Sequence, residues 1–146
     1  MRREAPPGSH PSDEGAPVWI SAVETSADLH GADLMRSLRR ENPELAFLGI
    51  GGELMRGEGL ESVGRAEELS AMGISEVVGL IPRALTLFRR IKRILRERPP
   101  SCLILLDAPD FHFRVAKMAS KLGIPVYYYI TPQGWAWRTG RVNFIR

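Results

Sequence analysis

The sequence has few long hydrophobic runs and few cysteines. Its densest apolar runs, Cys102–Leu106 and Val126–Ile130, are much shorter than the roughly 18 residues that cross a bilayer. Met1–Pro7 lacks the apolar core of a secretory signal. The single cysteine, Cys102, excludes a disulfide within the chain and is expected to be a buried structural thiol. We therefore expect a cytoplasmic protein without a membrane-spanning segment.

Metal-ligand spacing and a glycine-rich nucleotide turn are also missing. His10, His30 and His112 are scattered, and none forms a pattern with cysteine or a second histidine. The stretch Gly49–Gly52 is the richest in glycine, but Leu54 occupies the last glycine position of the dinucleotide fingerprint. The turn also follows the second predicted strand instead of the first. No metal and no cofactor are expected.

The composition is that of one globular domain: 146 residues, 44% hydrophobic and 25% charged. Residues 1–17 are rich in proline, glycine and charge and predict a disordered tail, so the domain is expected over 18–146. The net charge of +3 is unevenly placed, with seven basic residues and one acid, Glu97, between Arg83 and Arg98. This cluster indicates either an anionic partner or a solvated helix face.

Short apolar segments alternate with amphipathic ones along the chain. The predicted strands are 18–23, 46–50, 61–63, 102–106 and 126–130, and the predicted helices are 28–41, a short one after 52, 81–98 and 111–122. The apolar positions expected on the inner face of helix 81–98 are Ile81, Ala84, Leu85, Phe88, Ile91 and Leu95. Strand–helix alternation with continuously apolar strands predicts an α/β fold, a doubly wound and mostly parallel sheet.

In such a sheet ligands bind beyond the carboxyl ends of the strands. Two acidic segments fall there, Glu24–Asp28 and Asp107–Asp110. Asp107 directly follows a buried strand, where burial raises a carboxyl pKa and suits a general base. Asp110 and Asp28 have a simpler interpretation as caps of the helices that they precede.

A third segment at the same edge, Thr131–Arg138, combines two indoles with a guanidinium. Trp135 and Trp137 suit stacking on sugar rings or acyl chains, and Arg138 suits phosphate. Aromatic residues in a loop can equally form local core. With the basic helix they would also suit single-stranded RNA, but no RNA-binding signature is present, so nucleic acid is not expected as a partner.

Four segments together resemble a known family. They are AVETSAD (22–28), MGISEVVG (72–79), LDAPDFH (106–112) and TPQGWAWR (131–138). Their order and spacing over 18–146 are similar to those of lipid-A-disaccharide synthases, which carry AGExSGD, MGxxEVxG, IDAPDFN and SPxxWAWR. Val23 and Ala27 stand where the family has glycine, and His112 stands where it has asparagine.

The resemblance implies the acceptor-side, Rossmann-like half of a two-domain GT-B glycosyltransferase that uses no metal. The chain would stop before the UDP-binding domain and would be inactive alone. The implied reaction transfers 2,3-diacylglucosamine from UDP-2,3-diacylglucosamine to 2,3-diacylglucosamine 1-phosphate. Asp107 would deprotonate the acceptor hydroxyl. The implied substrate-binding residues are Glu24, Ser26, Asp28, Asp110, Trp135, Trp137 and Arg138.

The implied substrates carry acyl chains, so the resemblance also implies a peripheral position at the inner face of the inner membrane. The residues expected to contact lipid are Ile74, Val77, Val78, Leu80, Ile81, Arg89, Arg90 and Arg93. Packing of these apolar residues into the sheet is the competing interpretation. A non-catalytic lipid- or partner-binding module that keeps only this fold is the alternative function.

Overall fold

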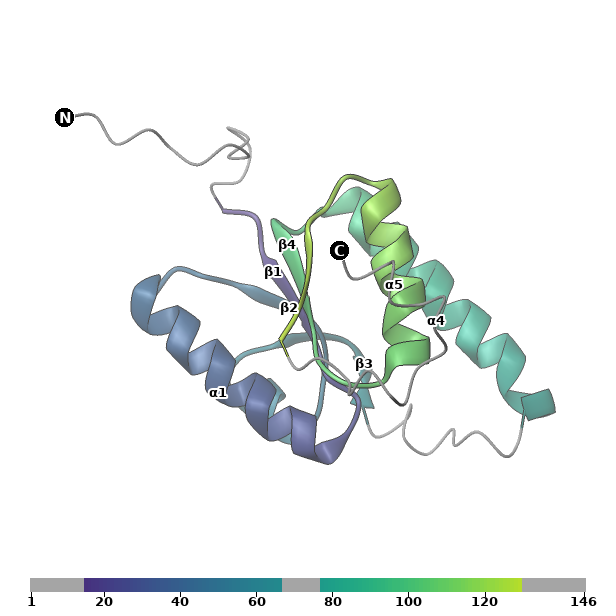
Figure 1. Cartoon of the computed structure of the whole chain (residues 1–146), viewed down its shortest axis with the longest axis horizontal. Helices are drawn as coiled ribbons and strands as arrows, with labels where there is room; N and C mark the ends of the chain where they lie inside the picture. The colour runs from purple at the N-terminus through teal and green to yellow at the C-terminus, as the bar shows by residue number, and fades with distance from the viewer. Residues whose placement is uncertain (1–14, 67–76, 130–146) are drawn as a thin grey trace.

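The computed structural model describes residues 15–66 and 77–129, with only the helical backbone given for 77–83. Strands and helices alternate throughout (Figure 1). The elements are β1 (Val18–Ser21), α1 (Thr25–Glu41), β2 (Phe47–Gly51), α2 (Glu53–Gly57), β3 (Glu61–Arg65), α4 (Val77–Glu97), β4 (Cys102–Leu105), α5 (Pro109–Lys121) and β5 (Val126–Tyr128). The predicted tail falls outside the described residues up to residue 14. At its end, the Pro17 carbonyl accepts a hydrogen bond from Ser101 N–H at 2.9 Å.

The described strands form one five-stranded sheet in the order β3-β2-β1-β4-β5, and every neighbouring pair is parallel. The chain winds from β1 outward through β2 to β3, then crosses back to β4 and β5 on the other side. The prediction of a doubly wound parallel sheet is confirmed. The winding direction reverses between β1 and β4, and the carboxyl ends of these two strands therefore mark the point where such folds bind ligands.

Both faces of the sheet are covered, α1 and α2 lying on one and α4 and α5 on the other (Figure 1). Side chains alternate along β1, so Ile20 packs toward α1 and α2 while Trp19 packs toward α4 and α5; both are fully buried. Burial on two sides explains why β1, β2 and β4 are largely apolar. Cys102 is half-buried beside the α1–α2 core, which makes it less enclosed than expected.

Helix α4 begins at Val77, four residues earlier than predicted. Ile91 and Leu95 are fully buried, as expected, but Leu85 is 48% exposed. Leu87 and Ile94 pack against the core in its place. The helical period explains the error, because positions three and four residues from Ile91 share its face and Leu85, six residues away, does not.

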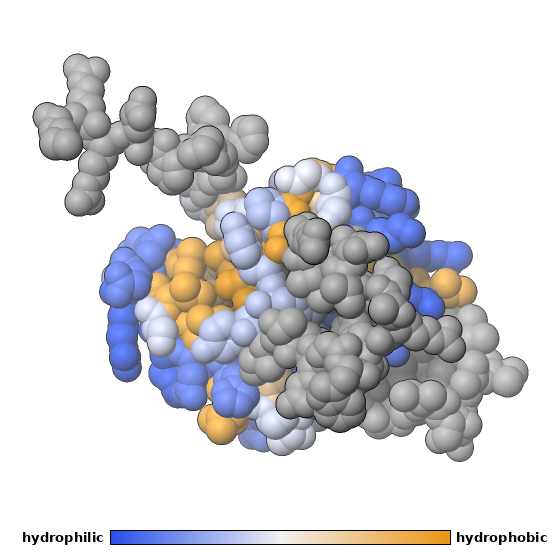
Figure 2. Space-filling view, viewed as in Figure 1, coloured by the Kyte–Doolittle hydropathy of each residue, from blue (hydrophilic) through white to orange (hydrophobic). Residues whose placement is uncertain are grey.

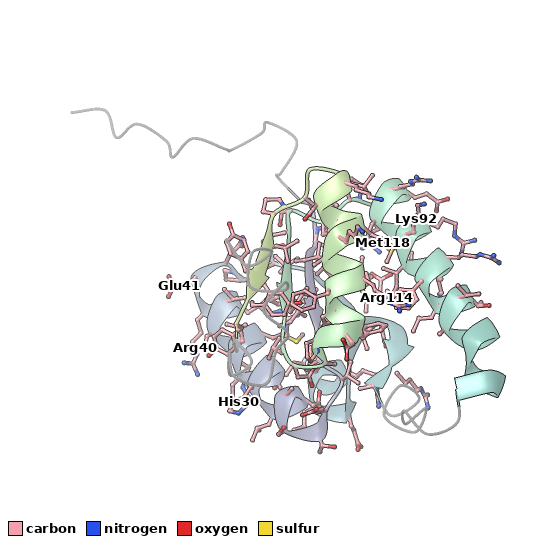
Figure 3. The ribbon with its side chains drawn as sticks, turned by 45° about the vertical axis from the view of Figure 1, so that its right-hand side comes forward. His30, Arg40, Glu41, Lys92, Arg114 and Met118 are labelled. Atoms are coloured by element: carbon pink, nitrogen blue, oxygen red, sulfur yellow. The ribbon has the colours of Figure 1, made fainter. Side chains whose placement is uncertain are left out.

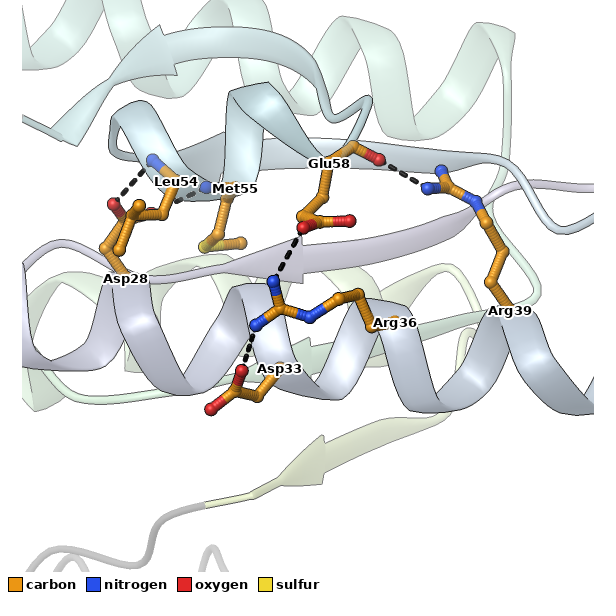
Figure 4. A network of polar contacts seen from close by, with 7 residues as sticks. All are labelled: Asp28, Asp33, Arg36, Arg39, Leu54, Met55 and Glu58. Atoms are coloured by element: carbon orange, nitrogen blue, oxygen red, sulfur yellow. Dashed lines mark hydrogen bonds and ion pairs between the residues drawn. The ribbon is translucent and has the colours of Figure 1, made fainter.

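Asp28 does not cap its own helix, because α1 begins three residues before it, at Thr25. Its carboxylate is buried and instead accepts hydrogen bonds from the backbone N–H groups of Gly52, Leu54 and Met55, at 2.9, 3.0 and 3.1 Å. Figure 4 shows the bonds from Leu54 and Met55. These groups are the first donors of α2, where a negative charge is favourable. A Cβ on Gly52 would come within 2.5 Å of the Asp28 carboxylate, so this turn requires glycine.

Two further contacts hold α1 to α2. Arg36 forms an ion pair with Glu58 at 2.8 Å, and the Arg39 guanidinium donates to the Glu58 carbonyl (Figure 4). Arg39 also stacks over the Phe47 ring of β2. The spacing of Leu29, Leu34, Met35 and Leu38 predicts that they share one side of α1, but Leu29 is 50% exposed. The inner positions of α1 are instead small or flexible residues such as Ala32 and Met35.

Replacing Asp28 with alanine should lower the free energy of unfolding by about 2–3 kcal/mol, because three backbone donors lose a buried acceptor. Urea unfolding followed by circular dichroism measures the change. Asp33→Ala is the matched control, since Asp33 lies on the same helix and pairs with Arg36 at the surface. Its urea midpoint should stay close to that of the parent. Equal midpoints for the two variants would contradict the capping role.

Candidate active site

The loops after β1 and β4 lie side by side at the winding reversal. Leu106 N–H donates to the Ser21 carbonyl at 2.9 Å, which extends the pairing of these two strands by one residue. Beyond this bond the chains separate into the loops that lead to α1 and α5. The two acidic segments predicted from the sequence therefore meet at this edge of the sheet.

Asp107 joins these loops through its side chain. Its carboxylate accepts hydrogen bonds from Val23 N–H at 3.0 Å and from Glu24 N–H at 2.5 Å. Asp107 and the next residue, Ala108, have left-handed backbones, with φ of +49° and +35°. Such a conformation costs a residue with a side chain about 1–2 kcal/mol, so surrounding contacts must maintain it.

The environment of Asp107 raises the pKa of its carboxyl toward neutral pH. Burial raises the pKa of the Asp107 carboxyl to about 6, while the hydrogen bonds from Glu24 and Val23 N–H act against this rise. The nearby Glu24 carboxylate raises the pKa further. The side chain remains 11% exposed. The arrangement suits a group that accepts a proton at neutral pH, because its conjugate acid is neither too weak nor too strong.

A buried pair of polar side chains lies behind Asp107. His112 Nδ1 is 2.8 Å from the Asp107 carbonyl oxygen, and His112 Nε2 is 2.7 Å from Ser21 Oγ; Ser21 and His112 are both fully buried. A carbonyl only accepts, so Nδ1 carries the hydrogen and Nε2 accepts from the serine hydroxyl. Burial lowers the pKa of His112 to about 4, although the carbonyls of Asp107 and Leu106 favour its protonated form. The imidazole is therefore neutral at neutral pH.

In the sequence, His112 stands out only as a departure from the family pattern, and no role is predicted for Ser21. One signal was present: Ser21 is the single polar residue in the strand Val18–Ser21. A hydroxyl at the last position of a doubly covered strand requires a partner. The sequence alone did not identify that partner, because it lies 91 residues away.

The remaining predicted site residues lie at different distances from Asp107. Glu24 is exposed and contacts Asp107 through its amide, and Ser26 is exposed in the first turn of α1. The Asp28 carboxylate accepts hydrogen bonds from the backbone at the start of α2. Asp110 is exposed in the first turn of α5; it does not cap a helix at Phe111, because α5 begins at Pro109 without a side-chain cap.

Several predicted positions lie outside what the structure describes. Trp135, Trp137, Arg138 and Ile74 fall beyond the described residues. For four more, the structure gives only the helical backbone: Val77, Val78, Leu80 and Ile81. Arg89, Arg90 and Arg93 are described and exposed on α4.

Hydrophilic and charged side chains lie on the outer surfaces of helices on both sides of the molecule. Figure 2 shows hydrophilic residues over the outer side of α1, at the left of the view. Figure 3 shows Lys92 of α4 and Arg40 of α1 on opposite sides of the molecule.

A cavity of about 200 Å³ between β3 and α4 is lined in part by Glu61, Arg90 and Arg98. Asp107 does not contribute to it.

The described residues contain neither a cluster of metal ligands nor a membrane-spanning helix. Within 15–66 and 77–129, no three His, Cys, Asp or Glu side chains are grouped as metal ligands. None of the helices in this part of the chain combines the length and apolar character needed to cross a bilayer.

The pKa of His112 predicts how stability depends on pH. The folded pKa, about 4, lies below the ordinary value of 6.5, so stability is full above pH 6.5 and falls as pH drops toward 4. The raised pKa of Asp107 acts in the opposite direction between its ordinary value of 3.8 and about 6. A comparison of the parent with His112→Asn cancels this opposing effect, since both proteins keep Asp107.

We expect the stability advantage of the parent over His112→Asn to shrink by on the order of 2 kcal/mol between pH 7 and pH 4.5. Chemical unfolding at both pH values measures it. A constant difference would show that His112 takes up its proton as readily in the folded state as in the unfolded state.

Comparison with known proteins identifies the chain. A family model described as lipid-A-disaccharide synthetase matches residues 18–146. The lipid-A-disaccharide synthase of Geobacter metallireducens is 47% identical over 131 residues, and that of Anaeromyxobacter dehalogenans (strain 2CP-C) is 46% identical over 128. The match covers 88% of this chain and 33% of each relative, so the chain spans about a third of their length.

Among solved structures, the calicheamicin glycosyltransferase CalG4 aligns over 88% of this chain and 34% of its own, with 12% identity and a TM-score of 0.49. The family model, by contrast, covers all four segments singled out in the sequence, Asp107 and His112 included. On this match, supported by the high identity to the curated relatives, the chain belongs to the lipid-A-disaccharide synthetase family.

Proposed function

We propose that this chain supplies the acceptor side of a lipid-A-disaccharide synthase. The proposed reaction transfers 2,3-diacylglucosamine from UDP-2,3-diacylglucosamine to 2,3-diacylglucosamine 1-phosphate and releases UDP. Family membership supports the reaction class. The observation that carries the assignment of roles is Asp107, a carboxyl group with a pKa of about 6 at the winding reversal of a parallel sheet.

Asp107 is proposed as the general base. It would take the proton from the 6-hydroxyl of the acceptor sugar as that oxygen attacks the anomeric carbon of the donor. The bond between the anomeric carbon and the new oxygen forms while the bond to the UDP oxygen breaks. The amides of Val23 and Glu24 fix the orientation of the carboxylate without satisfying all its lone pairs, so a free lone pair can accept the proton.

The other predicted substrate residues differ in how directly the geometry supports them. Glu24 and Ser26 are exposed on the loop and first turn next to Asp107, and Asp110 is exposed on α5; all three are proposed to contact the acceptor. Asp28 is proposed to act indirectly, because its carboxylate already accepts three backbone N–H groups of α2. Trp135, Trp137 and Arg138 remain proposed cleft residues on the strength of the family pattern.

The donor site is proposed to belong to a part of the enzyme beyond this chain. The chain covers about a third of its relatives, and a two-domain GT-B arrangement would place the UDP-binding residues in the second domain. A reaction between two lipid-linked sugars requires both to be held in one orientation. On this proposal the acceptor-side domain alone forms no disaccharide.

The proposed enzyme works at the membrane surface, at the inner face of the inner membrane. Arg89, Arg90 and Arg93 are exposed on α4, and the apolar residues Ile74, Val77, Val78, Leu80 and Ile81 precede or begin this helix. The topology supports this role, because α4 follows β3 and so begins at the carboxyl edge of the sheet, on the same side as Asp107. Apolar insertion beside basic contacts is the pattern of an interfacial protein.

In the full-length enzyme, Asp107→Asn should reduce kcat by about 10²–10⁴-fold, the usual effect of losing a general base. In the parent, kcat/KM should rise with pH through about 6 and level off, because the base acts when deprotonated. The variant should lose this rise. Asp33→Asn, on the exposed face of α1, is the control. Activity of Asp107→Asn within a few-fold of the parent, with an unchanged pH profile, would refute the assignment.

Membrane association should weaken when the basic face of α4 is reversed. A variant with Arg89, Arg90 and Arg93 changed to glutamate should lose binding to anionic vesicles, and the parent should release as salt increases, since each contact contributes about 1 kcal/mol. Val78→Ser should weaken binding to neutral and anionic vesicles alike.

The matched control for this experiment reverses three exposed charges elsewhere, Arg40, Lys117 and Lys121, and so has the same net charge. Vesicle co-sedimentation across a salt series provides the measurement. The membrane proposal fails if both triple variants bind like the parent, or if both lose binding equally.

A further inference from the structure

One residue, His112, bonds both carbonyls of the left-handed turn at Asp107 and Ala108. His112 donates from Nδ1 to the Asp107 carbonyl at 2.8 Å, and its own amide donates to the Ala108 carbonyl at 2.9 Å. The two carbonyls belong to the two residues with positive φ. A single residue, one turn into α5, therefore bonds both strained peptide units.

Ser21 fixes the imidazole in turn. Its hydroxyl donates to His112 Nε2 at 2.7 Å, which leaves Nδ1 as the protonated nitrogen and directs it at the Asp107 carbonyl. Ser21 is also held by the sheet, because its carbonyl accepts Leu106 N–H and its residue pairs with Leu105. A continuous chain of bonds thus runs from the central strand through the imidazole to the backbone of Asp107.

The opposite side of Asp107 is fixed as well. Its carboxylate accepts Val23 N–H and Glu24 N–H on the loop that leaves the same strand, β1. The backbone of Asp107 is therefore connected to β1 through His112 and Ser21. Its side chain is connected to the loop after β1 at Val23. Since His112 is fully buried, it has no route to a substrate and acts only through Asp107.

We propose that His112, oriented by Ser21, is a positioning residue that sets the direction of the Asp107 carboxylate for proton transfer. This inference rests on the proposed function of Asp107 as the base. Loss of the bond from Nδ1 would release the left-handed turn and rotate the carboxylate away from the acceptor hydroxyl. A displacement of about 1 Å at a reacting group lowers a rate by about 10²-fold.

Two substitutions distinguish the contribution of Nδ1 from that of Nε2. His112→Asn places an amide N–H where Nδ1 stands, so it keeps the bond to the Asp107 carbonyl and loses the partner of Ser21. His112→Gln places its amide where Nε2 stands, so it keeps a partner for Ser21 and loses the bond to Asp107. Both replacements are polar and smaller than or similar to histidine, which makes them a matched pair.

In the full-length enzyme, we expect His112→Gln to lower kcat by about 10–100-fold while the KM of each substrate changes less than about threefold. His112→Asn should retain kcat within about fivefold. Urea midpoints of both variants provide the structural readout. If kcat follows the midpoint instead of the nitrogen that is retained, or if both variants keep full kcat, the positioning role is overturned.

A second readout is independent of turnover. Nitrogen-15 NMR of this chain at pH 7 should show His112 neutral and protonated at Nδ1, and this tautomer should persist in Ser21→Ala, because the Asp107 carbonyl accepts only from a protonated Nδ1. A proton on Nε2 in the parent would overturn the positioning role and leave the proposed function standing. Full activity of Asp107→Asn, by contrast, would remove the proposed base whatever the tautomer. If His112→Gln fails to fold, the Ser21→Ala/His112→Leu double variant, which removes both members of the buried hydroxyl–imidazole pair, should fold and still show the reduced kcat.

Discussion

The proposed site depends on the bonds between the Asp107 carboxylate and the amides of Val23 and Glu24. They join the loops that leave β1 and β4, the two strands between which the sheet reverses its winding. This contact adds to the connection that Ser21 and His112 make behind it. With it, an acidic group stands at a defined position in the place where parallel sheets bind ligands.

Two opposing effects act on the pKa of the Asp107 carboxylate. Its structural bonds to N–H groups favour the ionised form and lower its pKa, whereas burial and the neighbouring Glu24 carboxylate raise it. Burial is the largest of these effects, and the resulting pKa is about 6. A carboxylate that served only as a cap, like Asp28 at α2, would have no need of this balance. The combination of fixed orientation and near-neutral pKa is what makes Asp107 the centre of the proposed chemistry.

Much of the fold could be predicted from local patterns in the sequence. Continuous apolar strands such as Cys102–Leu105 follow directly from burial on both faces, and Asp107 was identified because it follows such a strand. Contacts between distant segments could not be predicted in this way. Asp28 caps a helix 24 residues further along the chain, and Leu85 is exposed because the tertiary contact of α4 centres on Ile91. The Ser21–His112 pair depends on the crossover that brings β1 beside β4, which neither residue reveals alone.

The most direct test of this account is the titration of the Asp107 carboxyl itself. Carbon-13 NMR of the chain labelled at aspartate side chains, with Asp107 assigned from the Asp107→Asn variant, follows that one carboxyl from pH 3 to pH 8. The account predicts a midpoint near the pKa of about 6. A midpoint at or below 4 would mean that the amides of Val23 and Glu24 outweigh burial. Asp107 would then be a structural cap instead of a base.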